Sequence, residues 1–312
     1  MQTRGAAAPR PLAVAVALGL VYVLWGSTSP AIKVAVASIP PFIMVALRFA
    51  AAGALLWTWC RVRRVALPDA AEWRGAALTG FMLLVASNGV FSWTLRFIPA
   101  GVGALFFALA PLWMAVFGFL LYRERLAPLA ALGLTIGLGG MVFLYSPSGA
   151  QHLPLVPTVL GVVCSLAWAF GSMIQRKLAR SDVVQMSAMQ MLVAALVLAL
   201  LGLFSGERFA VAEFTPAALA ALLYLIVFGS IVGFSAFLWL MNNVPTTLAS
   251  TYSYVNPVVS IVLSVALLHE RFTWQLGAGA GVIIFGVAVM MLAPRPRASV
   301  AEARLERRQV VR

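Results

Sequence analysis

Ten long apolar stretches dominate this chain of 312 residues. They cover residues 12–36, 40–60, 75–95, 99–122, 128–145, 157–175, 187–204, 216–241, 246–268 and 274–292. A helix needs about 20 mostly apolar residues to cross a bilayer, and only short connections separate these stretches. The sequence therefore predicts an all-α membrane protein with ten transmembrane helices.

The composition agrees with a membrane protein. Hydrophobic residues make up 62% of the chain and charged residues 10%, whereas soluble domains have about 45–50% and 25%. The net charge of +13 does not indicate nucleic-acid binding, because the basic residues form short clusters between apolar runs rather than one polar face. Cys60 and Cys164 lie in or beside apolar stretches, so we expect free thiols.

The basic residues also predict an orientation. If the N-terminus is cytoplasmic, 17 of the 22 Lys and Arg residues fall on the cytoplasmic side. The outer side then holds Lys33, Arg96, Arg208 and Arg271, while Arg48 lies inside the second stretch. This asymmetry favours two cytoplasmic termini, and we predict a multi-pass protein of the bacterial cytoplasmic (inner) membrane.

One segment of the chain recurs 146 residues later. APLWMAVFGFLLYRER begins at Ala110 and NPVVSIVLSVALLHER begins at Asn256. At this spacing, without a gap, Trp93 matches Trp239 and Pro111 matches Pro257, among nine identities between residues 93 and 140. Five stretches per copy is an odd number, so the second copy enters the membrane from the opposite side. Such inverted repeats are typical of secondary transporters. We predict repeats over 1–147 and 148–294, with a basic cytoplasmic tail over 295–312.

Several short motifs, in this order and spacing, resemble the ten-helix EamA-type exporters of the drug/metabolite transporter superfamily. They are Trp25-Gly26-Ser27 with Lys33, Leu47-Arg48-Phe49, Pro111 with Glu124-Arg125, Trp168-Ala169, and Pro257 with Glu270. The resemblance covers residues 12–292. It implies export of small metabolites, often amino acids, and it places the first and sixth helices, with Trp25 and Trp168, around a central cavity. For both tryptophans plain packing is the alternative.

Three prolines mark candidate helix breaks. Pro111 and Pro257 lie in the middle of their apolar stretches, and Pro30 lies in the first. A proline inside a helix leaves the carbonyl four residues earlier without a donor, and such a carbonyl must face protein, water or substrate rather than lipid. We expect these positions to kink their helices, to line a cavity, or both.

Polar residues within the stretches mark candidate substrate contacts. Tyr252 and Asn256 are four residues apart and share a helical face, and Asn88 raises the same question in the third stretch. Bonding to a neighbouring helix is the alternative role for both amides. Because Phe106 is matched by Tyr252 and Ala110 by Asn256, polar capacity is concentrated in the second copy. We predict substrate contacts at Trp25, Asn88, Phe106, Trp168, Tyr252 and Asn256.

Arg48 is the only charged residue deep inside a stretch. It lies eight residues after Pro40, about 12 Å along a helix, where an unpaired charge is costly. We expect it to bond to backbone carbonyls as a structural lock or to meet a substrate carboxylate. The matched position holds the neutral Gln190, which favours the lock.

Glycine pairs and absent groups complete the prediction. Gly133-xxx-Gly137 and Gly277-xxx-Gly281 predict a close seam between the fifth and tenth helices.

No Asp or Glu lies in the core of any stretch, so we expect facilitated export of small neutral or zwitterionic solutes. The isolated His152 and His269 indicate neither an enzyme nor a metal site. We expect no cofactor and no nucleic-acid partner, but a monomer in the lipid bilayer with a small-molecule substrate. Other metabolites, vitamins, nucleotide-derived compounds and amphiphilic drugs are the alternative substrates.

Overall fold

The computed structural model describes residues 11–122, 128–144, 153–178, 182–244 and 251–292, and in these ranges it is helical without strands. The first half holds α1 (Pro11–Gly26), α2 (Thr28–Ala35), α3 (Pro41–Val62), α4 (Ala70–Gly80), the π-helix η1 (Phe81–Gly89), α5 (Val90–Thr94), α6 (Ala100–Ala108), α7 (Ala110–Tyr122) and α8 (Pro128–Leu144). The second half holds α9 (Leu155–Leu178), α10 (Val183–Phe204), the 3-10 helix η2 (Val211–Glu213), α11 (Pro216–Tyr224), the π-helix η3 (Leu225–Val232), α12 (Gly233–Asn243), α14 (Tyr252–Leu268) and α15 (Trp274–Met291). The all-α prediction is confirmed. The predicted tail, 295–312, and Glu124-Arg125 lie outside the described residues.

Many of these helices follow one another end to end and form longer apolar runs. Seven runs are long and apolar enough to cross a membrane: Pro11–Ala35, Pro41–Val62, Ala70–Thr94, Ala100–Leu120, Leu155–Gln175, Val183–Phe204 and Pro216–Phe237. Three shorter apolar helices are Ala131–Phe143, Val255–Leu268 and Trp274–Met290. These helices lie in the apolar stretches of the sequence. The count of ten crossings and the side of the termini stay predictions.

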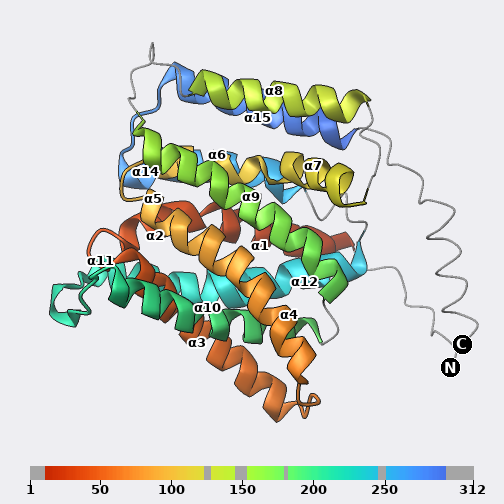
Figure 1. Ribbon diagram of the computed structural model, residues 1–312. Coiled ribbons are helices and arrows are strands. Elements are labelled where there is room, and N and C mark those ends of the chain that lie inside the picture. Colours follow the sequence, from red (N-terminus) through yellow and green to blue (C-terminus); the bar gives the residue numbers. More distant parts are fainter. Residues whose placement is uncertain (1–10, 123–127, 145–152, 179–181, 245–250, 293–312) are drawn as a thin grey trace, which may run out of the picture.

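Equivalent helices of the two halves pack against each other. The second predicted helix of each repeat forms the pair α3 and α10, the fourth forms α6 and α14, and the fifth forms α8 and α15. In Figure 1, α8 and α15 run side by side at one edge of the molecule, and α3 and α10 lie toward the opposite edge. The first helix of one repeat packs on the third of the other, because α1 contacts α12 and α9 contacts η1.

The seam between α8 and α15 depends on glycine. A methyl group on Gly133 would lie 2.5 Å from the carbonyl oxygen of Gly286, and one on Gly286 would lie 2.5 Å from the backbone nitrogen of Gly137. The prediction for Gly133 and Gly137 is therefore confirmed. The prediction for Gly277 and Gly281 is wrong, because the three atoms nearest to a methyl group on Gly277 belong to the Phe272 ring, and one on Gly281 would meet nothing within 4 Å.

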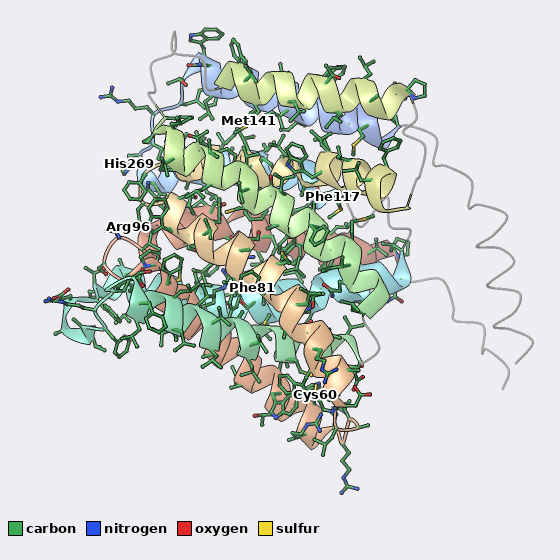
Figure 2. All side chains as sticks on the ribbon, in the orientation of Figure 1. Cys60, Phe81, Arg96, Phe117, Met141 and His269 are labelled. Carbon is green, nitrogen blue, oxygen red and sulfur yellow. The ribbon has the colours of Figure 1, made fainter. Side chains whose placement is uncertain are left out.

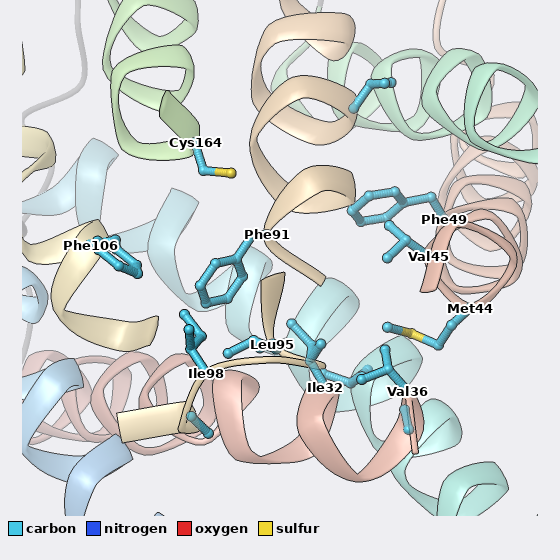
Figure 3. Packing of buried hydrophobic residues seen from close by; sticks show 14 of the residues in the cluster. Ile32, Val36, Met44, Val45, Phe49, Phe91, Leu95, Ile98, Phe106 and Cys164 are labelled. Atoms are coloured by element: carbon cyan, nitrogen blue, oxygen red, sulfur yellow. The ribbon is translucent and has the colours of Figure 1, made fainter. Parts of the chain in front are cut away.

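A continuous apolar core connects the two halves. Figure 3 shows part of it: in this view Phe91 lies between Phe106 and Ile32, with the thiol of Cys164 on one side and Ile98 on the other. Both cysteines are buried and free, as predicted. Many large apolar side chains are instead exposed along the outside of the bundle, where a bilayer would solvate them.

One end of the bundle is closed by long-range helix caps. Arg96 and His269 mark this end in Figure 2, and Cys60 marks the opposite one. We call it the Glu270 end and define it by Ser38, Ile98, Glu207 and Glu270. Ser38 Oγ lies 3.2 Å from Thr215 Oγ1, so the segment that follows the first run meets the start of the run Pro216–Phe237.

Two helices that start at this end have a proline cap, which offers no side-chain oxygen to the free N–H groups of the first turn. At α3, the cap residue is Pro40, and the Glu207 carboxylate accepts from Phe42 N at 3.2 Å and from Ile43 N at 2.9 Å. A carboxylate also suits the positive end of a helix dipole. Glu207 follows α10, so a second-half residue caps a first-half helix.

The same arrangement occurs at α6, whose cap residue is Pro99. The Glu270 carboxylate accepts from Ala100 N at 2.7 Å and from Gly101 N at 3.3 Å. Lys33 Nζ donates to the Ile98 carbonyl at 2.7 Å just before this helix. The Glu270 bonds join the two halves, whereas the Lys33 bond lies within the first half.

Candidate functional site

The first and fourth helical runs are interrupted near their centres. Ser27 separates α1 from α2, and Leu109 separates α6 from α7. Pro30 and Pro111 each lie in the first turn of the helix after the break, where a missing N–H is tolerated. The backbone therefore breaks just before each proline.

Pro257 behaves differently. It lies inside α14, which continues from Tyr252 to Leu268. A cavity-lining role of these prolines stays a prediction, but the described residues of α14 show no interruption at Pro257, unlike those just before Pro111. The reason is that a proline removes one hydrogen bond and adds one clash, which a helix can absorb as a local distortion when its neighbours hold its course.

The runs Ala70–Thr94 and Pro216–Phe237 each contain a π-helical segment at a similar position. These are η1, with 9 residues, and η3, with 8 residues. Long π-segments are rare and concentrate at functional sites. Each carries small or polar residues, including Ser87 and Asn88 in η1 and Gly229 and Ser230 in η3. No feature of the sequence predicted them.

Three aromatic rings from α1, α12 and α14 form what we call the Trp25 cluster: Trp25, Phe237 and Tyr252. The ring of Tyr252 stands edge-on to Trp25 at 5.2 Å and to Phe237 at 5.7 Å, and Trp25 lies 4.9 Å from Phe237. Trp25 Nε1 donates to the carbonyl of Gly229 in η3 at 3.2 Å. The half-buried rings thus hold one face of η3 against α1 and α14.

Polar groups of α1 and α14 surround this cluster. In the orientation that satisfies its amide, Asn256 donates to the carbonyls of Tyr22 at 3.3 Å and Tyr252 at 3.2 Å. The hydroxyl of Tyr22 forms a hydrogen bond with Thr251 Oγ1. Asn256 and Tyr252 therefore share one face of α14, as their spacing predicts, and both face α1.

A second set of rings, the Trp168 cluster, comprises Phe91, Phe107 and Trp168. Phe107 stands edge-on to Phe91 at 4.7 Å and to Trp168 at 5.9 Å. Phe91 and Phe237 are 146 residues apart, which is the spacing of the repeat. The two clusters are thus built from equivalent helices of opposite halves, each with one tryptophan from the first helix of its repeat.

Two of the residues predicted to contact substrate have partners within the protein. Phe106 has no exposed surface, and a methyl group on Gly161 would lie 2.4 Å from its ring. The adjacent Phe107, not Phe106, reaches Trp168. Asn88 Nδ2 donates to the carbonyl of Leu83 in the same π-segment at 2.9 Å. The structure therefore brings together Trp25, Tyr252 and Asn256, but not Phe106 or Asn88, around one cluster.

Arg48 lies on α3 beside η3. It is 6% exposed, and its Nε donates to Ser230 Oγ at 2.8 Å. The predicted bond to a backbone carbonyl is replaced by a bond to this hydroxyl. The matched Gln190 donates to Thr79 Oγ1 at 2.7 Å, so each half has one polar contact of this kind.

Sequence reasoning missed four residues of these clusters and their supports: Phe91, Phe107, Gly229 and Phe237. Phe91 and Phe237 carried a signal, since they match at the repeat spacing two residues before the matched Trp93 and Trp239. Phe107 carried none, because the repeat pairs Phe106 with Tyr252. Gly229 becomes important only through the fold, which places its carbonyl beside Trp25.

Taken together, these features define a class. The architecture is that of a membrane transporter. It combines apolar helical runs of membrane-spanning length, equivalent helices paired across two halves, and interrupted helices beside aromatic clusters. The profile of the EamA-like transporter family matches residues 13–146 and again residues 156–292. The chain belongs to this family, which is part of the drug/metabolite transporter superfamily.

Individual relatives agree with this assignment. The chain is 34% identical over 277 residues to the "uncharacterized inner membrane transporter YedA" of Escherichia coli K12, covering 88% of this chain and 90% of the relative. It is 25% identical over 279 residues to the "uncharacterized transporter YvbV" of Bacillus subtilis, covering 88% and 90%. A "probable amino-acid metabolite efflux pump" of Salmonella typhimurium is 26% identical over 292 residues, covering 89% and 94%.

A solved crystal structure has the same fold. It matches with a TM-score of 0.65 at 24% identity, covering 91% of this chain and 99% of the other. With its apolar helical runs and its inner-membrane relative, this protein is a multi-pass transporter of the inner membrane.

Proposed function

We propose that this protein exports small metabolites, amino acids foremost, by alternating access between its two halves, residues 1–147 and 148–294. The observation that carries the proposal is the pair of aromatic clusters at different depths. Phe107 lies seven residues from the start of α6, about 10 Å from the Glu270 end, and Tyr252 lies about 24 Å from that end along α14. A substrate site between them is bordered by rings on both sides.

The chemistry around the clusters suits a particular kind of solute. Aromatic faces accept apolar side chains, and the Asn256 amide and Arg48 add polar contacts. Small neutral or zwitterionic solutes with apolar parts fit this description, and aromatic or branched amino acids are such solutes. The name of the Salmonella relative, a probable amino-acid metabolite efflux pump, supports the same substrate class.

The charge pattern supports facilitated transport. No Asp or Glu lies in the core of an apolar stretch, whereas proton-driven transporters commonly carry an intramembrane carboxylate. Glu207 and Glu270 cap helices at one end of the bundle. We propose a monomer in which the concentration gradient of the substrate drives export.

Reconstitution in liposomes tests the proposal. Vesicles that contain the protein and labelled amino acids should release label faster than loaded vesicles without protein. An imposed pH gradient should leave the initial rate of release unchanged. Trp168→Ala and Asn256→Ala should lower the flux while the protein stays folded. Trp274→Ala serves as the matched control, because that side chain is 73% exposed, and its flux should be normal.

Other metabolites are the second candidate. The aromatic clusters also accept vitamins, nucleotide-derived compounds and amphiphilic drugs, because stacking on rings does not distinguish these classes. Counterflow with each class, in the same vesicles, separates the candidates. Flux of such a compound without flux of any amino acid would replace the amino-acid assignment and leave the transporter assignment intact.

A further inference from the structure

The guanidinium of Arg48 makes fewer bonds than its burial requires. Arginine has five N–H donors, yet the described contacts of Arg48 are one hydrogen bond, from Nε to Ser230 Oγ, and a cation–π contact 5.3 Å from the Phe49 ring, which uses none of the N–H donors in a hydrogen bond. In the described part of the chain no carboxylate lies within ion-pair distance of it. Buried, unpaired charges in membrane helices mark substrate or ion sites by default.

The free donors are the ones best suited to a ligand. The described side-chain atoms that are sealed from solvent without a hydrogen bond are Arg61 Nε, Ser87 Oγ and Ser264 Oγ. The two terminal nitrogens of Arg48 are not among them, so they lie on the small accessible part of this residue. Parallel N–H groups of a guanidinium form paired hydrogen bonds with the two oxygens of a carboxylate.

Arg48 also lies next to the Trp25 cluster. Gly229 is the link, because its carbonyl accepts from Trp25 Nε1 at 3.2 Å and a methyl group on its Cα would lie 3.2 Å from Arg48 Nη2. The guanidinium and the indole therefore converge on one residue of η3. One amino-acid molecule is therefore large enough to contact both the Arg48 guanidinium and the rings of the Trp25 cluster.

The other half shows that the charge is not needed to join helices. Gln190, at the position matched to Arg48, makes its contact with Thr79 through a neutral amide at 2.7 Å. A neutral donor is thus sufficient for a bond of this kind between membrane helices. The positive charge at Arg48 requires a separate explanation.

We propose that the terminal nitrogens of Arg48 bind the carboxylate of the transported amino acid, while its apolar side chain packs on the Trp25 cluster. This inference rests on the proposed function and specifies it. The substrates are then monocarboxylates with an apolar side chain. The carboxylate is required for recognition, and the amino group is not.

Competition assays on the wild-type protein test this without any variant. In liposomes, export of labelled phenylalanine is measured against 3-phenylpropionate, which lacks the amino group, and against phenylalaninamide, which lacks the carboxylate. We expect 3-phenylpropionate to compete, and phenylalaninamide to require at least a tenfold higher concentration. Equal competition by the two compounds would overturn the inference and leave amino-acid export standing.

Variants provide the second arm. Arg48→Gln should raise the KM for phenylalanine at least tenfold and abolish the preference for 3-phenylpropionate over the amide. Arg48→Lys, which keeps the charge but not the paired donors, should fall between. Thermal shift in detergent gives a readout independent of flux: phenylalanine should raise the Tm of the wild type but not that of Arg48→Gln.

The outcomes separate the two proposals. An unchanged KM in Arg48→Gln would reject Arg48 as the carboxylate ligand while export itself stands. A strong fall in the Tm of ligand-free Arg48→Gln, with the amide competing as well as 3-phenylpropionate, would identify a structural lock instead. If the wild type transports no amino acid and none raises its Tm, the proposed function fails and the inference fails with it.

Discussion

The seam between α8 and α15 gives a sharp test of the fold, because two glycines of similar sequence context have opposite surroundings. A methyl group on Gly133 would lie 2.5 Å from Gly286 O and 2.6 Å from Met290 N, both backbone atoms that cannot rotate away. A methyl group on Gly281 would meet no atom within 4 Å. Gly133→Ala and Gly281→Ala therefore make the same chemical change, inside and outside the seam.

The magnitude follows from the geometry. Ordinary carbon contacts begin near 3.5 Å, so Gly133→Ala must push the two helices apart by roughly 1 Å, and such a gap forfeits a quarter to a half of each nearby dispersion contact. Overpacking of this kind costs about 1–3 kcal/mol. The gain in helix propensity from glycine to alanine, about 1 kcal/mol, is common to both variants. The difference in unfolding free energy between the two variants is then about 1–3 kcal/mol, with Gly133→Ala less stable.

Thermal unfolding in one detergent measures this difference. An unfolding entropy of about 2.1 cal/mol/K per residue gives roughly 1.5 °C per kcal/mol for a chain of 312 residues, so the Tm of Gly133→Ala should lie at least about 1.5 °C below that of Gly281→Ala. The latter should equal or slightly exceed the wild type. Equal Tm values for the two variants, or a lower one for Gly281→Ala, would refute the packing of α8 on α15 through Gly133.

Three further changes test other contacts. Trp25→Phe keeps an aromatic ring but removes the N–H group that donates to the Gly229 carbonyl. One hydrogen bond is worth about 0.5–1.5 kcal/mol, so the KM for the substrate should rise roughly two- to tenfold in liposomes. The control Trp274→Phe should have the KM of the wild type. Glu270→Gln removes the charge and one acceptor from the start of α6, and it should lower the unfolding free energy by about 1–2 kcal/mol. The control Glu213→Gln changes an exposed side chain and should leave the unfolding free energy unchanged. An equal loss of unfolding free energy in the two variants would contradict the helix cap. Ser87→Ala removes a buried hydroxyl that has no partner among the described residues, so stability should stay the same or rise by about 1 kcal/mol. Ser165→Ala breaks the bond from Trp113 Nε1 and should lower stability. A loss of stability in Ser87→Ala alone would contradict this reading of Ser87.

Hydrophobic length and internal repetition made the architecture predictable. A membrane helix must satisfy its own backbone, so apolar stretches of sufficient length leave helix as the available structure. The repeat then fixes which helices are equivalent. The seam was predicted only in part, since Gly281 and Gly286 both lie on α15 but point about 140° apart at 3.6 residues per turn. Sequence spacing alone did not distinguish the packed face from the lipid face.

The features that sequence reasoning missed depend on contacts between distant segments. Glu207 and Glu270 cap α3 and α6, and no local pattern connects a carboxylate to a helix start more than 160 residues away. Phe107 rather than Phe106 reaches Trp168, because successive side chains of a helix point about 100° apart and the sequence does not show which of the two faces Trp168. The π-segments have no residue pattern of their own, because their wider turns are stabilised by the helices packed around them.

The differences between the halves agree with the proposed recognition of a polar substrate group beside η3. Leu83 and Gly229 are 146 residues apart, so their carbonyls are equivalent under the repeat. The carbonyl of Leu83 accepts from Asn88 of its own helix, whereas that of Gly229 accepts from Trp25 of another. The first π-segment thus bonds its Leu83 carbonyl internally, while the second presents its Gly229 carbonyl to α1 and its Ser230 hydroxyl to Arg48 on α3. Two similar aromatic clusters suit a transporter whose cavity must close on either side of the membrane. An amino acid carries its charged groups at one end, so a polar site in one half only is sufficient to bind that end.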